Sequence, residues 1–70
     1  MNIKIKNTTN LPVDMRGEWA EFLYFHRLIT RGEDVVVVQL RYGGKRWIAI
    51  EHIEEMPDEL RDEIMLRKLK

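Results

Sequence analysis

Two short apolar runs with a pair of glycines between them constrain this chain more than any other feature. The runs span residues 35–40 and 47–50, and Gly43-Gly44 lies between them. β-Branched residues on both sides of glycine-rich turn residues are typical of a β-hairpin. The sequence therefore predicts a hairpin over residues 34–54. An isolated hairpin is only marginally stable in water, so the rest of the chain must cover it.

Two registers of this hairpin differ in which side chains share a face. A two-residue glycine turn sets Arg41 opposite Arg46, and like charges directly opposite each other are unfavourable. A three-residue loop over residues 43–45 instead sets Arg41 opposite Trp47 and gives one apolar face and one wetter face, so we favour it. Trp47 is then expected on the less buried face, beside the Arg41 guanidinium. The apolar pairs of this register are Leu40 with Ile48, Val38 with Ile50 and Val36 with His52.

Length and composition limit the class of protein. Seventy residues make one small domain, in which a single core supplies about 3–5 kcal/mol of net stability. The chain has no cysteine, which excludes disulfides and thiolate metal sites. Its twelve lysines and arginines balance twelve acids, so no global field attracts nucleic acid or an anionic membrane. No apolar run is long enough to span a bilayer, and no secretion signal is present. We therefore expect a soluble, cytoplasmic protein.

The first part of the chain predicts a strand followed by a helix. Residues 1–10 alternate Ile3 and Ile5 with polar residues and end in turn formers. This pattern is typical of an edge strand, although a basic N-terminal arm has the same sequence. A proline and an aspartate then suggest a helix entry, and we predict a helix over residues 12–31 that covers the hairpin. Its apolar face comprises Trp19, Phe22, Leu23, Phe25, His26 and Ile29.

The segment after the hairpin predicts a second helix, over residues 57–69. A proline starts it, acids occupy its first turn and basic residues its last turn, in agreement with the helix macrodipole. Its apolar positions form a narrow stripe, so packing against the sheet or another chain must hold it. The stripe comprises Leu60, Ile64, Met65, Leu66 and Leu69. The chain is thus predicted to be one small α+β domain over residues 1–70. Its order is β-α-β-β-α, with an antiparallel sheet that is built on the central hairpin and covered by a helix.

The sequence offers little material for catalysis or metal binding. Serine and cysteine are absent, and the threonines lie at predicted turns or at a helix end, where no base is near them. His26 is expected in the core and His52 beside the sheet, which does not suit a metal site. The glycine pair lacks the spacing of a phosphate-binding loop. We therefore predict that the protein is not an enzyme and has no cofactor or metal.

Two surfaces remain as candidate binding sites. One is the hairpin tip, where cations alternate with aromatic residues, which suits phosphates and stacked bases. The other is the acidic segment that leads into the second helix, which suits a basic protein surface. The tip candidates are Arg41, Tyr42, Lys45, Arg46 and Trp47, and the acidic candidates are Glu54, Glu55, Asp58, Glu59, Asp62 and Glu63.

Elimination favours a non-enzymatic binding module. We expect a regulator that docks on a larger protein assembly, such as the transcription machinery. One alternative is a nucleic-acid-binding module that uses the hairpin tip. Another is a structural homodimer in which Trp47 and the second helix complete a core too small to stand alone. The predicted partner is therefore a larger protein or, in the first alternative, nucleic acid, and not a membrane. The chain itself is predicted to be a monomer or a weak homodimer.

Overall fold

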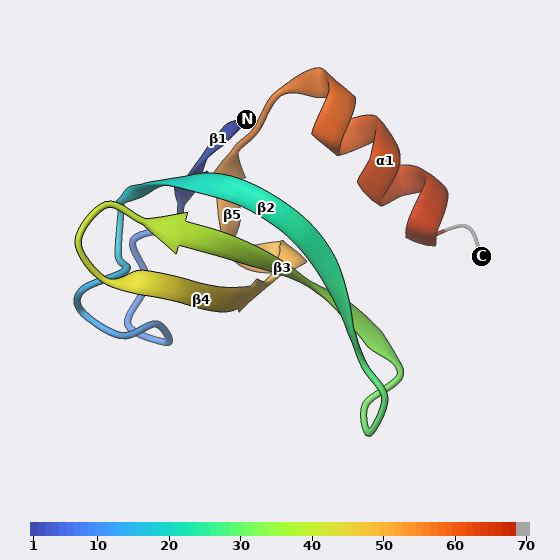
Figure 1. The fold of residues 1–70 in the computed structure, drawn as a ribbon, viewed down its shortest axis with the longest axis horizontal. Helices are drawn as coiled ribbons and strands as arrows, with labels where there is room; N and C mark the ends of the chain where they lie inside the picture. Colours follow the sequence, from blue (N-terminus) through green and yellow to red (C-terminus); the bar gives the residue numbers. More distant parts are fainter. Residues whose placement is uncertain (69–70) are drawn as a thin grey trace.

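Five antiparallel strands and one C-terminal helix make up the molecule (Figure 1). The structure is a computed structural model and describes residues 1–68. The strands are β1 (Asn2–Ile5), β2 (Trp19–Leu28), β3 (Glu33–Leu40), β4 (Gly44–Ala49) and β5 (Ile53–Glu55). A single 3-10 turn, η1 (Ile50–His52), joins β4 to β5, and α1 (Asp58–Lys68) follows. The strand order β4-β3-β2-β1-β5 makes β4 and β5 the two edges of the sheet.

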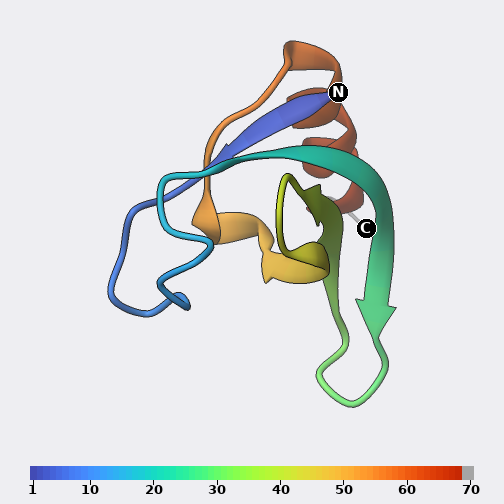
Figure 2. The ribbon, with the colours of Figure 1, turned by 60° about the vertical axis from the view of Figure 1, so that its left-hand side comes forward.

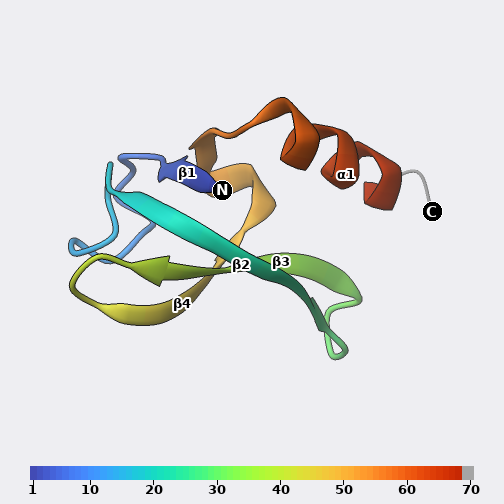
Figure 3. The ribbon, with the colours of Figure 1, turned by 45° about the horizontal axis from the view of Figure 1, so that its top comes forward.

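The sheet is curled, and its inner face carries the core (Figure 2). Helix α1 lies on the other side of β2 from β4 (Figures 1 and 3) and contributes two side chains to this core. Phe22 and Phe25 of β2 pack against the core with their ring centroids 5.2 Å apart. The buried residues of the core are Ile3, Ile5, Leu11, Met15, Ala20, Val36, Val38, Leu40, Ile48, Ile53, Leu60 and Ile64.

The predicted helix over residues 12–31 is wrong. Most of residues 6–18 form a loop with successive turns, and residues 19–28 form the long strand β2. The misleading feature is a β-bulge at Leu23, the extra residue between the pairs Phe22–Val38 and Tyr24–Val37. A bulge shifts the alternation of a strand by one residue. Two inward side chains, at positions 22 and 25, therefore stand three residues apart and imitate helical spacing.

As a result, the residues predicted to form one helix face lie in three different environments. Phe22 and Phe25 point into the core, whereas His26 pairs with Val35 on the outer face and is exposed. The expectation that His26 lies in the core is therefore wrong. Ile29 lies in the β2–β3 turn and is 90% exposed. The inner face of the hairpin is instead covered jointly by α1, β1, β5 and the β1–β2 loop, all of which contribute buried residues to the core.

Residues 2–5 form a strand, as one of the two N-terminal alternatives predicted, but this strand is not at an edge. β1 lies between β2 and β5, and Ile3 and Ile5 are fully buried. Lys4 points to the other side and pairs with Glu54 at 3.2 Å. The alternation of residues was interpreted correctly, but the pairing of β1 with β5 depends on a segment that the sequence assigned to the hairpin.

The central hairpin is confirmed, although it is shorter than predicted and has another register. It comprises β3 and β4 and ends at Ala49, because residues 50–52 turn away towards β5. Only residues 41–43 lie between the pair Leu40–Gly44, and Gly44 has a left-handed φ of 72°, which glycine adopts without strain. The predicted loop, residues 43–45, is thus displaced along the chain.

The register error leaves the faces of the hairpin unchanged. The structure pairs Val36 with Ile48, whereas we expected Leu40 opposite Ile48, a displacement of four residues. Because side chains alternate with a period of two, an even displacement keeps every residue on its predicted face. Trp47 therefore still lies on the outer face and is 56% exposed. Its partner across the strands is Val37 and not Arg41.

The C-terminal helix is confirmed over the described residues, and Leu69, the last residue of the prediction, lies outside them. Leu60 and Ile64 are buried, whereas Met65 and Leu66 are 58% and 59% exposed. Only half of the described apolar stripe is thus buried. The chain is a small α+β domain with an antiparallel sheet, but its order is five strands followed by one helix. Within residues 1–68, no helix is long and apolar enough to cross a membrane.

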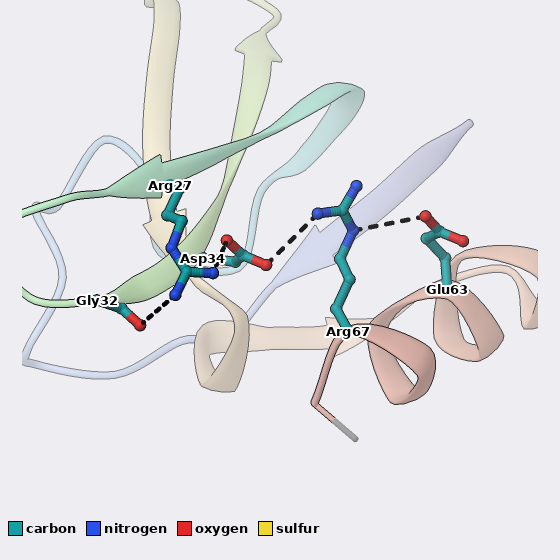
Figure 4. A network of polar contacts seen from close by, with 5 residues as sticks. All are labelled: Arg27, Gly32, Asp34, Glu63 and Arg67. Carbon is teal, nitrogen blue, oxygen red and sulfur yellow. Dashed lines mark hydrogen bonds and ion pairs between the residues drawn. The ribbon is translucent and has the colours of Figure 1, made fainter. Parts of the chain in front are cut away.

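A polar network ties α1 to the β2–β3 hairpin (Figure 4). Asp34, whose side chain is only 15% exposed, lies 3.4 Å from Arg67 Nη1 and 3.7 Å from Arg27 Nη1. The Arg67 guanidinium carbon also lies 4.0 Å from the ring centroid of Phe25, and its Nε lies 3.5 Å from Glu63. Arg67 therefore joins the end of the helix to both strands of the hairpin.

Substitution of Arg67 by alanine should lower the free energy of unfolding by about 1–2 kcal/mol, because the change removes a partly buried ion pair and a cation–π contact. Arg61→Ala is the matched control on the same helix. Among the described residues, Arg61 pairs only with the highly exposed Asp58, at 3.8 Å, so its loss should cost less than about 0.5 kcal/mol. Urea unfolding monitored by circular dichroism measures both values, and equal losses would show that the network does not fix α1.

Candidate binding surface

A row of three side chains crosses the outer face of the sheet. Tyr24 of β2, Val37 of β3 and Trp47 of β4 lie directly opposite one another. The tyrosine is 50% exposed, the tryptophan 56%, and the valine between them only 9%. Since neighbouring strands are about 4.8 Å apart, the two aromatic side chains start about 10 Å from each other. We call these three residues the outer row.

Polar residues border the outer row on one side, and a mixed row borders it on the other. Towards the β3–β4 turn, Glu21, Gln39 and Lys45 form the next outward row. The row towards the β2–β3 turn contains His26, Val35 and Ala49. An apolar centre with a polar rim is the usual arrangement of a protein interface. A third half-exposed aromatic residue, Trp19, lies opposite Lys4 on the same face.

The structure does not bring the five predicted tip residues together as one site. Arg46 lies opposite the buried Val38 and pairs with Asp14 of the β1–β2 loop at 3.2 Å, so its charge is already engaged. Trp47 belongs to the outer row. Tyr42 is 93% exposed at the turn, with the Arg41 guanidinium carbon 6.0 Å from its ring centroid. The tip therefore reduces to Arg41, Tyr42 and Lys45, and neither cation has an ion pair within the described part of the chain.

The predicted acidic candidates are all exposed, but the chain itself engages half of them. Glu54 pairs with Lys4 at 3.2 Å. Asp58 pairs with Arg61 at 3.8 Å and Glu63 with Arg67 at 3.5 Å. The remaining candidates are Glu55, Glu59 and Asp62. Within residues 1–68, no three His, Asp or Glu side chains are placed to hold a metal ion.

Sequence reasoning missed two features of the surface. Tyr24 was not among the residues of the predicted apolar helix face, although the pattern Trp-Ala-Glu-Phe-Leu-Tyr-Phe from residue 19 is rich in strand-forming aromatic residues. The second feature is a groove of about 670 Å³ between β4, η1 and the β1–β2 loop. Leu11 and Met15 anchor that loop in the core and also line the groove. The sequence signal for this groove is that Leu11 and Met15 are apolar residues four positions apart in a segment rich in turn-forming residues.

No family model, curated protein or solved structure matches the chain. The binding properties of the outer face therefore follow from its own residues. Half-exposed tyrosine and tryptophan side chains combine a large apolar area with a hydrogen-bonding group and few rotatable bonds. The outer face can therefore bind a partner by burial of the aromatic rings.

Proposed function

We propose that the protein is a non-enzymatic binding module that docks on a larger protein through the outer face of its sheet. The observation that carries the proposal is the outer row, Tyr24–Val37–Trp47, whose aromatic side chains are half exposed on a continuous sheet. Tyrosine and tryptophan are enriched among the residues that dominate binding energy at protein interfaces. A rigid sheet also presents them with little loss of conformational entropy on binding.

The charges beside the outer row indicate the chemistry of the partner. Lys45 lies in the neighbouring outward row, and Arg41 lies at the adjacent turn. Both are cations without an ion pair among the described residues. The surface that fits is an apolar patch with acidic groups at one side. A module of this kind acts as an accessory factor that regulates the assembly it docks on, for example the transcription machinery.

Capture from a lysate with matched variants tests the docking surface. The purified chain serves as bait, the lysate is treated with nuclease, and the bound proteins are identified by mass spectrometry. A Tyr24→Ala/Trp47→Ala bait should lose the captured assembly, because each central aromatic residue of an interface contributes about 2 kcal/mol or more. A Tyr42→Ala bait, which removes an exposed aromatic residue outside the row, should retain it. Equal capture by all three baits would refute the outer face as the docking surface.

A second candidate function is nucleic-acid binding through the tip. It is favoured by the exposed Tyr42 and the two adjacent cations, Arg41 and Lys45, which leave their charges available for phosphates. Single-strand binding should then weaken steeply with salt, and Arg41→Ala/Lys45→Ala should reduce the slope of log K against log salt by about 1.4. Fluorescence anisotropy with a labelled oligonucleotide measures this slope. A slope that the double variant does not alter would exclude the tip.

A further inference from the structure

The edge strand β4 lies along a groove in the described surface. β4 is the terminal strand of the sheet. All five residues from Lys45 to Ala49 line the groove of about 670 Å³, those that point inward and those that point outward alike. A hollow bordered by consecutive residues of a strand runs along its edge and not over one face. The lining also includes three apolar residues of the β1–β2 loop, Leu11, Pro12 and Met15.

The charges of this groove differ between its two ends. Lys45 lies at the start of β4 and Glu51 just after its end, and both line the groove. The other charged lining residues already have partners in the chain: Arg46 pairs with Asp14 at 3.2 Å and Arg31 with Glu33 at 3.6 Å. Within the described residues, Lys45 and Glu51 have none. The edge thus carries one available cation at one end and one available anion at the other.

We propose that this edge pairs in antiparallel orientation with β4 of a second copy of the chain, which gives a two-fold symmetric dimer. With the two-fold axis at Ile48, Lys45 of each copy lies opposite Glu51 of the other, so two attractive charge pairs form across the contact. Parallel pairing of the same edges would bring like charges together. A lysine on an edge strand normally prevents pairing with another strand. Here Lys45 lies at one end of the edge, so it disfavours parallel pairing and permits antiparallel pairing.

The dimer goes beyond the docking function and does not depend on it. The two sheets join into one, and in this register Trp47 of each copy lies opposite Ala49 of the other on the shared outer face. α1 is not needed for the contact, because Leu60 and Ile64 are already buried in its own domain and α1 and β4 lie on opposite sides of β2 (Figure 1). A paired strand of six residues is short, so association depends on protein concentration.

Two charge-reversal variants test the proposal by multi-angle light scattering over a series of concentrations. The native chain should shift from monomer to dimer, and Lys45→Glu and Glu51→Lys should each weaken self-association at least tenfold, since each homodimer then contains two repulsive contacts. An equimolar mixture of the two variants should dimerise again, because every contact in the mixed dimer is attractive. Circular dichroism shows that each variant is folded.

Several outcomes would overturn this dimer. They are a native chain that stays monomeric up to about 1 mM, single variants that associate like the native chain, and a mixture that remains monomeric. The Tyr24→Ala variant separates the two proposals, because Tyr24 does not line the groove. It should lose protein capture and keep the dimer.

Discussion

Replacement of Leu60 by alanine is expected to bring the protein to the edge of unfolding, whereas the same change at Leu66 should leave its stability almost unaltered. Leu60 is 1% exposed and belongs to the core cluster, while Leu66, on the same helix, is 59% exposed. Truncation of a buried leucine costs about 2–5 kcal/mol, and a domain of this size has only about 3–5 kcal/mol of net stability. Helix propensity differs little between leucine and alanine, so the change in helix propensity is small and the same in both variants.

Urea unfolding at 25 °C measures this difference, with tryptophan fluorescence and circular dichroism as two probes. The Leu60→Ala midpoint should fall close to zero denaturant, and the Leu66→Ala midpoint should match that of the native chain. Similar midpoints for the two variants would mean that α1 does not complete the core. In that case the sheet would have to be stable without its helix.

The hairpin could be predicted because its signals are local. β-Branched residues, a glycine pair and alternation lie within about twenty residues of sequence, and the faces of β3 and β4 follow from alternation alone. The register could not be fixed in the same way. It depends on which residue adopts the left-handed conformation, and both Gly43 and Gly44 allow it, whereas the structure uses Gly44. Trp47 was therefore assigned to the correct face with the wrong neighbour.

The long strand β2 was not predictable from periodicity. Its bulge at Leu23 places inward side chains three residues apart, which is also the spacing of a helix. Strand propensity of the aromatic residues from Trp19 to Phe25 pointed to the correct structure but was outweighed by the helix-entry signals around Pro12. Those signals belong to turns, since the Met15 N–H donates to the Pro12 carbonyl at 3.0 Å.

The candidate surface depends on contacts between distant segments, which a single sequence does not reveal. Arg46 was assigned to the tip, but it pairs with Asp14, more than thirty residues earlier in the chain. The outer row joins residues 24, 37 and 47 from three strands, and its existence requires the pairing of β2 with β3. Without that pairing, Tyr24 and Trp47 are two unrelated aromatic residues, which explains why the sequence predicted the tip and not the row.

Lysine at Val36 should prevent folding, whereas lysine at the next position, Val37, should be tolerated. Val36 is fully buried on the inner face, where it pairs with Phe25 and Ile48. An unpaired charge at such a site costs several kcal/mol, which exceeds the net stability of so small a domain. Val37 is 9% exposed on the outer face, where a lysine stem can lie between the two rings and extend its ammonium group into water.

One-dimensional NMR and circular dichroism distinguish the two variants, and Val37→Lys should retain dispersed signals with a loss of about 1–2 kcal/mol. The two lysine variants test whether the outer face is a surface or part of the core. The four consecutive valines from residue 35 are all buried, as they would be in a strand covered on both faces. In the structure, Val37 lies directly between Tyr24 and Trp47 on the neighbouring strands. If Val37→Lys unfolds like Val36→Lys, Val37 is part of the core, and the outer face does not accommodate a charge at the centre of the outer row.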